Sequence, residues 1–119
     1  MGDSQDLRAR TKQFALRILR LYRALPHKEE ARILGKQLLR SGTSVGANYR
    51  AACRARSRAE FIAKLGIVLE EADETVFWLE LLHKGGIVKH EKLDALVTEA
   101  HELTSIFVAS LRTAKGIAS

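Results

Sequence analysis

Apolar residues recur along this chain at steps of three and four positions, which is the spacing of one face of an α-helix. The longest stripe of this kind runs through Phe61, Leu65, Val68, Ala72, Val76 and Leu79. Regular alternation of apolar and polar residues, which would indicate β-strands, is rare. The pattern therefore predicts an all-α protein.

Four stretches carry this spacing, and they predict helices over about residues 4–24, 27–52, 58–84 and 89–114. Pro26 ends the first helix because proline disfavours helical geometry in the residue before it. Ser57 and Glu60 form a capping box at the start of the third helix, and Gly85–Gly86 ends that helix. Helices of this length with short connections predict one domain, residues 1–119, folded as an up-down-up-down antiparallel four-helix bundle.

The second predicted helix contains a run of small residues between Ser41 and Ala47. Gly42 and Gly46 lie within the helical pattern, where each glycine costs roughly 1 kcal/mol relative to alanine. Two glycines four residues apart let a neighbouring helix approach closely, so we predict a continuous helix that packs tightly here. A break at Ser41–Gly42 is the alternative. The residues assigned to the packing are Gly42, Ser44, Gly46 and Ala47.

The third predicted helix is apolar around more of its circumference than one buried face requires, because Ile62, Leu69 and Trp78 flank its main stripe. A helix buried on more than one side either lies centrally or joins an interface between subunits. In a chain of 119 residues we favour the interface. The residues assigned to this oligomer interface are Phe61, Ile62, Leu69 and Trp78.

The composition is that of a soluble globular protein, with 46% hydrophobic and 29% charged residues. No apolar run approaches the roughly 18 residues of a membrane-spanning helix, and the first residues lack the pattern of a signal peptide. The single cysteine, Cys53, excludes an internal disulfide and fits a reducing compartment. We therefore expect a cytoplasmic protein that does not enter membranes.

The sequence assembles no catalytic, cofactor or metal site. The glycine run lacks the spacing of a phosphate-binding loop and does not follow a strand. Glu80 and His83 have the Glu-x-x-His spacing of di-iron bundles, but the second pair that such a site needs is missing. His83 is instead expected to interact favourably with the negative end of its helix. We therefore expect a protein that is not an enzyme and that binds no cofactor or metal.

Charge is unevenly distributed along the chain. Residues 1–58 contain fourteen Lys and Arg against four Asp and Glu, a net charge of +10, whereas residues 59–119 contain six against ten, a net charge of −4. The sum is the overall net charge of +6. A basic half can bind nucleic acid or another polyanion, or it can pair with the acidic half of a neighbouring subunit. Both interpretations stay open, and they are compatible with each other.

Arginine is concentrated around the end of the second predicted helix, where the guanidinium fork suits the oxygens of a phosphate. Together with arginines of the first helix, the candidate phosphate contacts are Arg10, Arg17, Arg20, Arg50, Arg54, Arg56 and Arg58. Solubility, or pairing with the acidic cluster of residues 70–74, is the alternative role. The absence of an evident aromatic array argues against sequence-specific binding of single strands.

The region from Gln37 to Leu79 carries an extended motif. Its parts are Gln37-Leu38-Leu39-Arg40, Ser44-Val45-Gly46-Ala47-Asn48-Tyr49-Arg50, Ser57, Glu60-Phe61, Lys64-Leu65, Glu70-Glu71-Ala72-Asp73-Glu74-Thr75 and Trp78-Leu79. With this motif the chain resembles, over nearly its whole length, the four-helix bundle proteins encoded within intervening sequences of bacterial 23S rRNA genes. The chain departs from the family pattern after Arg50, where an acidic residue is usual and this sequence has Ala51-Ala52-Cys53-Arg54.

The resemblance implies an assembly and a set of partners. Members of the family look like homopentamers, shaped as a barrel with a basic surface. The family is also similar to the accessory protein of diversity-generating retroelements, which associates with a reverse transcriptase and nucleic acid. The first hypothesis is therefore a ring-like homopentamer that binds structured RNA or DNA through Arg and Lys side chains. The second is a protein–protein adaptor or assembly factor, for example for a reverse transcriptase, whose charges pair subunits.

Overall fold

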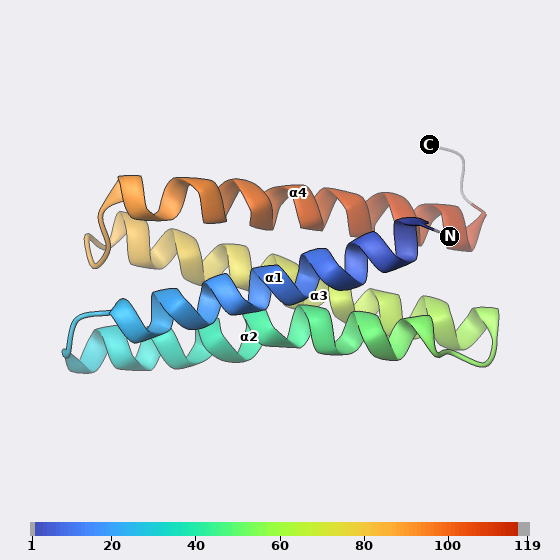
Figure 1. Ribbon diagram of the computed structural model, residues 1–119, viewed down its shortest axis with the longest axis horizontal. Helices are drawn as coiled ribbons and strands as arrows, with labels where there is room; N and C mark the ends of the chain where they lie inside the picture. Colours follow the sequence, from blue (N-terminus) through green and yellow to red (C-terminus); the bar gives the residue numbers. More distant parts are fainter. Residues whose placement is uncertain (1, 117–119) are drawn as a thin grey trace.

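Four helices form an elongated antiparallel bundle that measures 45 × 25 × 22 Å (Figure 1). The computed structural model describes the backbone of residues 2–116 and the side chains from residue 6 onward. The helices are α1 (Gly2–Ala24), α2 (Glu29–Cys53), α3 (Arg58–Lys84) and α4 (His90–Lys115). No strand occurs among residues 2–116, so the prediction of an all-α four-helix bundle is confirmed.

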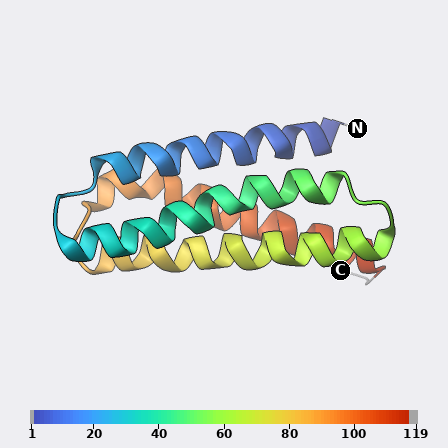
Figure 2. The same cartoon turned by 90° about the horizontal axis from the view of Figure 1, so that it is seen from below.

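Helices that follow one another in the sequence also lie side by side (Figures 1 and 2). α2 packs against α1 on one side and α3 on the other, and α4 packs against α3, whereas the neighbours α1 and α4 are in much looser contact. No helix of the described chain is long and apolar enough to cross a membrane.

The helix ends lie close to the predicted positions, because local sequence determines them. α1 ends at Ala24, before Pro26, and Gly86 and Gly116 both take a φ of 74° after α3 and α4. That left-handed conformation favours glycine. At the start of α3 the Ser57 hydroxyl accepts a hydrogen bond from the Glu60 N–H at 3.1 Å, as the capping box predicts.

The predicted stripes form the core. Its largest fully buried side chains are Phe14 and Ile18 of α1, Leu38 and Val45 of α2, Leu65, Val68, Leu79 and Leu82 of α3, and Leu93, Leu103 and Phe107 of α4. Full burial of one such side chain contributes about 1.5–3 kcal/mol. The core therefore supplies most of the free energy that holds the four helices together.

The glycines of α2 lie against α1. A Cβ atom added to Gly42 would be 2.8 Å from the Ile18 side chain, and one added to Gly46 would be 3.3 Å from the Thr11 carbonyl oxygen. Because α2 is continuous through both glycines, the alternative of a helix break at Ser41–Gly42 is wrong.

Two other residues assigned to this packing behave differently. Ser44 is half-buried, and its hydroxyl donates to the Arg40 carbonyl oxygen at 2.7 Å. Ala47 is exposed, so its assignment to the helix seam is wrong. The reason is geometric, since successive helical residues are rotated by about 100° and Ala47 follows the inward-facing Gly46 directly.

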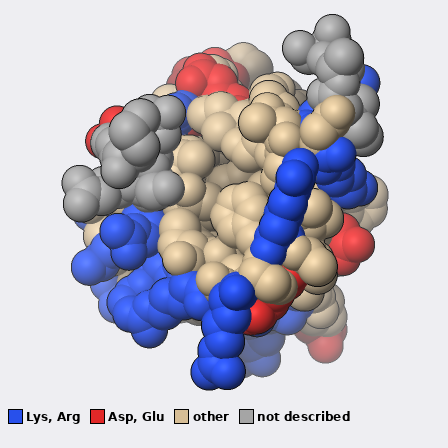
Figure 3. All heavy atoms as spheres, turned by 90° about the vertical axis from the view of Figure 1, so that its right-hand side faces the viewer, with Lys and Arg blue, Asp and Glu red and all other residues tan. Residues whose placement is uncertain are grey.

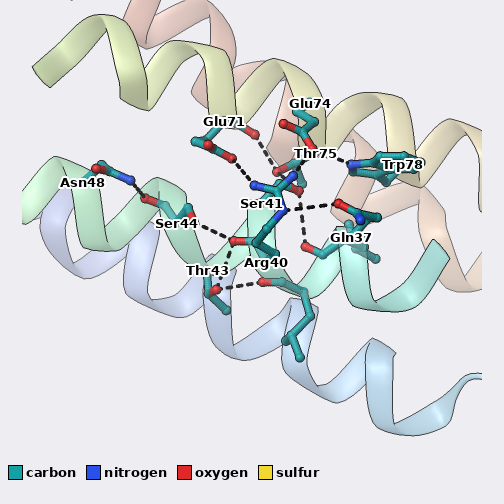
Figure 4. Close-up of polar contacts among 12 residues, drawn as sticks. Gln37, Arg40, Ser41, Thr43, Ser44, Asn48, Glu71, Glu74, Thr75 and Trp78 are labelled. Carbon is teal, nitrogen blue, oxygen red and sulfur yellow. Dashed lines mark hydrogen bonds and ion pairs between the residues drawn. The ribbon is translucent and has the colours of Figure 1, made fainter. Parts of the chain in front are cut away.

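A polar cluster fixes the register of α2 against α3 (Figure 4). The buried hydroxyls of Ser41 and Thr75 are hydrogen-bonded at 3.0 Å, and Thr75 also donates to the Glu71 carbonyl oxygen at 2.7 Å. Above them Arg40 forms ion pairs with the carboxylates of Glu71 and Glu74. A one-residue slip would separate both sets of partners, and the buried hydroxyls would then lack a hydrogen bond.

We expect Thr75→Val to lower the free energy of unfolding by about 1–3 kcal/mol, because it leaves the buried Ser41 hydroxyl with only the Leu38 carbonyl oxygen at 3.4 Å. Urea unfolding of Thr75→Val, Ser41→Ala and the double variant measures this cost. The double variant should lose less than the sum of the two single losses, because neither hydroxyl is then left unpaired. Strictly additive losses would contradict the coupling.

Candidate nucleic-acid interface

Basic side chains are concentrated at the end of the bundle where the chain passes from α2 to α3. Figure 3 faces this end, and Lys and Arg cover most of its lower left part. A cavity of about 560 Å³ opens there between the C-terminal part of α2 and the N-terminal part of α3. Its lining consists of Ala47, Arg50, Ala51, Arg54, Arg56, Glu60 and Lys64.

A second cavity of about 490 Å³ continues from the first, between α1 and α2. It is lined by Arg8, Ala9, Lys12, Ala15, Thr43, Gly46, Ala47 and Arg50. Because Ala47 and Arg50 line both cavities, the two form one groove. We call it the basic groove, and its cations are Arg8, Lys12, Arg50, Arg54, Arg56 and Lys64.

Small residues form the floor of the basic groove and leave it open. Ala9 and Ala15 of α1 and Gly46, Ala47 and Ala51 of α2 lie between the long basic side chains. The run of small residues in α2 therefore has two consequences. Gly42 and Gly46 let α1 approach closely, and the small side chain of Ala47 leaves the groove beside that contact open.

The cations of the basic groove are available for an outside ligand. Within residues 6–116 none of the six forms an ion pair. Among the described side chains, the only carboxylate in the lining is that of Glu60, which accepts a hydrogen bond from the Arg56 backbone N–H at 3.3 Å. Six cations against one carboxylate give the groove a net charge of +5.

Arg10 was predicted to contact phosphate, but α4 engages it instead. Its guanidinium is 2.7 Å from a Glu99 carboxylate oxygen and 2.7 Å from one of Glu102. The hydrogen bond to Glu99 raises the pKa of Arg10 above its ordinary value, Glu102 adds to this effect, and burial opposes it. Arg10 therefore connects α1 to α4, and its local charge is more than neutralised.

Arg58 is likewise directed away from the basic groove. Its Nε donates to the Ala114 carbonyl oxygen at 2.7 Å, in the last turn of α4. A cation at this position satisfies a carbonyl that the helix leaves free and interacts favourably with the negative end of the helix dipole. The structure thus gives Arg58 a capping role between α3 and α4.

Of the seven predicted phosphate contacts, the structure brings Arg50, Arg54 and Arg56 together in the basic groove. Arg17 and Arg20 do not line it. Arg17 follows Arg10 by seven residues, two helical turns, and therefore shares the side of α1 that faces α4. Arg20 is exposed on α1.

Sequence reasoning missed three cations of the basic groove, namely Arg8, Lys12 and Lys64. Arg8 and Lys12 are four residues apart, so the sequence does show that they share a helix face. That this face borders α2 depends on how α1 is rotated in the bundle, which only the packing of Thr11 and Ile18 against the glycines of α2 defines.

A second surface is apolar and lies on the outer side of α3. Ile67, Phe77 and Leu81 are 44%, 51% and 36% exposed, and we call them the outer face of α3. The residues predicted for an oligomer interface, Phe61, Ile62, Leu69 and Trp78, do not belong to this face and are half-buried. Three of them, all except Ile62, already pack against the core of their own chain.

Three comparisons with known proteins bear on this chain. The family model of the 23S rRNA-intervening sequence proteins matches residues 4–109. A crystal structure of a protein of unknown function from the S23 ribosomal protein family of Bacteroides thetaiotaomicron is similar, with a TM-score of 0.85 and 38% sequence identity. That similarity covers 92% of this chain and 97% of the other. Comparison with curated proteins gave no match.

Proposed function

This chain belongs to the 23S rRNA-intervening sequence protein family, and on that premise we propose that it is a non-enzymatic, homo-oligomeric bundle that binds structured RNA or DNA. The observation that supports the proposal is the basic groove, in which six cations that form no ion pair within residues 6–116 line one continuous surface. The family is named for an rRNA insertion, so a structured RNA is the natural first ligand to test.

The lining of the basic groove favours contacts to phosphate over contacts to bases. Arginine and lysine side chains provide the charge, and the lining as described contains no aromatic residue on which a base could stack. Proteins that bind in this way release counterions from the nucleic acid, so their affinity falls steeply with salt. We therefore propose binding that depends on backbone shape and charge and has little base specificity.

The decisive measurement is the affinity of the full chain for a labelled RNA hairpin, followed by fluorescence anisotropy between about 50 and 200 mM salt. Because each phosphate contact contributes about −0.9 to the slope of log K against log salt, six groove cations give a slope of up to about −5 per protomer. Absence of binding at low salt, or an affinity independent of salt, would contradict the proposed function.

The outer face of α3 supports self-assembly. Exposed apolar residues on one side of a helix favour contact with another protein surface. Most soluble oligomers consist of identical subunits, so a second copy of this chain is the first partner to consider. We propose a homopentamer, as the resemblance implies. Assembly would also multiply a modest affinity per protomer, because several basic grooves would then contact one nucleic acid.

We expect the wild-type chain to elute as an oligomer with a mass near five times 13.3 kDa, about 66 kDa, in size exclusion with light scattering. Phe77→Ser should shift the mass toward that of the monomer, because it removes the most exposed side chain of the outer face of α3. Val108→Ser, at an apolar residue of α4 that is 38% exposed, is the matched control and should leave the mass unchanged. An unchanged mass for Phe77→Ser would rule out this face as the interface.

The same apolar face supports a second candidate function, that of a protein–protein adaptor or assembly factor, with a reverse transcriptase as one example of a partner. On that hypothesis the cations pair subunits or partners and no nucleic acid binds. A stable oligomer that ignores both RNA and DNA at low salt would contradict nucleic-acid binding and favour the adaptor.

A further inference from the structure

Two histidines meet at the end of the bundle opposite the basic groove. His83 lies in the last turn of α3 and His90 begins α4, on either side of the Gly85–Gly86 turn. The His83 Nε2 and His90 Nδ1 atoms are 2.9 Å apart, and the ring centroids are 4.7 Å apart. The short connection therefore brings two imidazole nitrogens within hydrogen-bonding distance of each other.

Asp94 determines which nitrogen of His90 carries the proton. The His90 Nε2 atom is 3.0 Å from an Asp94 carboxylate oxygen, one turn further along α4. A carboxylate only accepts hydrogen bonds, so Nε2 is the protonated nitrogen. In the neutral ring the lone pair of Nδ1 then accepts a hydrogen bond from the His83 Nε2–H at 2.9 Å. Metal-binding histidines are held in this way, with the second nitrogen donating to a carboxylate. His83 binds a metal through Nε2 in its other neutral tautomer, in which the proton is on Nδ1.

The separation of the two nitrogens fits one class of ion. Imidazole nitrogens bind divalent transition metals at about 2.0–2.1 Å, and two nitrogens 2.9 Å apart then subtend about 90° at the ion. This angle is that of neighbouring ligands in the square-planar and octahedral geometries of Cu²⁺ and Ni²⁺. It is smaller than the tetrahedral angle that Zn²⁺ prefers.

We propose that His83 and His90 bind a divalent transition-metal ion of the copper or nickel type. The ligands are His83 Nε2 and His90 Nδ1, and Asp94 is the positioning residue for His90. No third His, Cys, Asp or Glu of the described chain joins them, so water fills the other positions of the ion. The side chains of His90 and Asp94 are mostly exposed, which gives the ion free access. The bound ion links the end of α3 to the start of α4.

Isothermal titration of the untagged full chain with NiCl₂ tests the site. We expect one Ni²⁺ per chain, and loss of at least about tenfold in affinity for both H83Q and H90Q, because a single imidazole cannot chelate. H101Q, which replaces an exposed histidine elsewhere on α4, is the matched control and should bind as the wild type does. Absence of Ni²⁺ binding by the wild type, or equal binding by H83Q and H101Q, would overturn the proposal.

D94N tests the positioning role separately. Loss of a carboxylate partner typically weakens metal binding by about 10–100-fold, and we expect this loss without a change in the unfolding midpoint of the metal-free chain. Ni²⁺ should raise the unfolding midpoint of the wild type and of H101Q, but not that of H83Q or H90Q. Undiminished Ni²⁺ affinity in D94N would show that Asp94 does not position His90. None of these residues lines the basic groove, so these results and those with RNA are independent.

Discussion

Replacement of Arg50, Arg54 and Arg56 together by glutamine is expected to weaken the binding of a structured RNA about 500-fold at about 0.1 M salt. Each phosphate contact changes log K by about 0.9 for every tenfold change in salt, so one contact is worth about eightfold at 0.1 M relative to 1 M. Three lost contacts multiply to about 500. The slope of log K against log salt should become shallower by about 2.7.

The matched control removes the same amount of charge from a part of the surface outside the basic groove. Arg20, Arg23 and Arg32 are exposed on α1 and α2, and none of them lines the basic groove. The triple variant with glutamine at these positions has the same net charge as the groove variant and should lose far less affinity. Equal losses in the two variants would show that binding depends on overall charge and would contradict a defined interface.

The sequence predicts the core well because a helix repeats at a fixed interval. Once Phe14, Ile18, Leu38 and Val45 are seen at helical steps, their burial follows from the need of each helix to cover one apolar side. Helix ends are predictable for a similar reason, since the conformation that Gly86 adopts is decided by the residue itself.

The site is less predictable because its composition depends on contacts between distant residues. Arg10 and Arg58 belong to the same basic half of the sequence as Arg50, yet their partners lie 89 and 56 residues away. Periodicity states which face of a helix is buried, but it does not state which neighbour borders each edge of that face. The sequence therefore does not identify the partner of a charged residue at such an edge. The arrangement of the helices in the bundle determines it.

The motif that carries the family resemblance is largely structural. Arg40, Glu71, Glu74, Thr75 and Trp78 all belong to it, and all of them join the polar cluster between α2 and α3 (Figure 4). Residues that hold two helices in register identify a fold. This explains why the resemblance predicts the architecture more sharply than the ligand.

Gly42→Leu is expected to lower the free energy of unfolding by at least about 3 kcal/mol, at the upper end of the cost of overpacking a core. A single Cβ at this position would already be 2.8–2.9 Å from two carbon atoms of Ile18, a fully buried and β-branched side chain. The three further carbons of leucine have no free volume in the seam, so α1 and α2 must separate.

Gly66→Leu is the matched control, because it makes the same change in the interior of another helix. A Cβ at Gly66 would meet no atom within 4 Å, so leucine there gains helix propensity without a clash. We expect it to raise the free energy of unfolding by about 0.5–1 kcal/mol. Urea unfolding of both variants at one protein concentration measures the difference, which should be about 4 kcal/mol. If Gly42→Leu and Gly66→Leu changed the free energy of unfolding by the same amount, helix propensity alone would explain the effect at Gly42. The close approach of α1 to α2 would then not depend on that glycine.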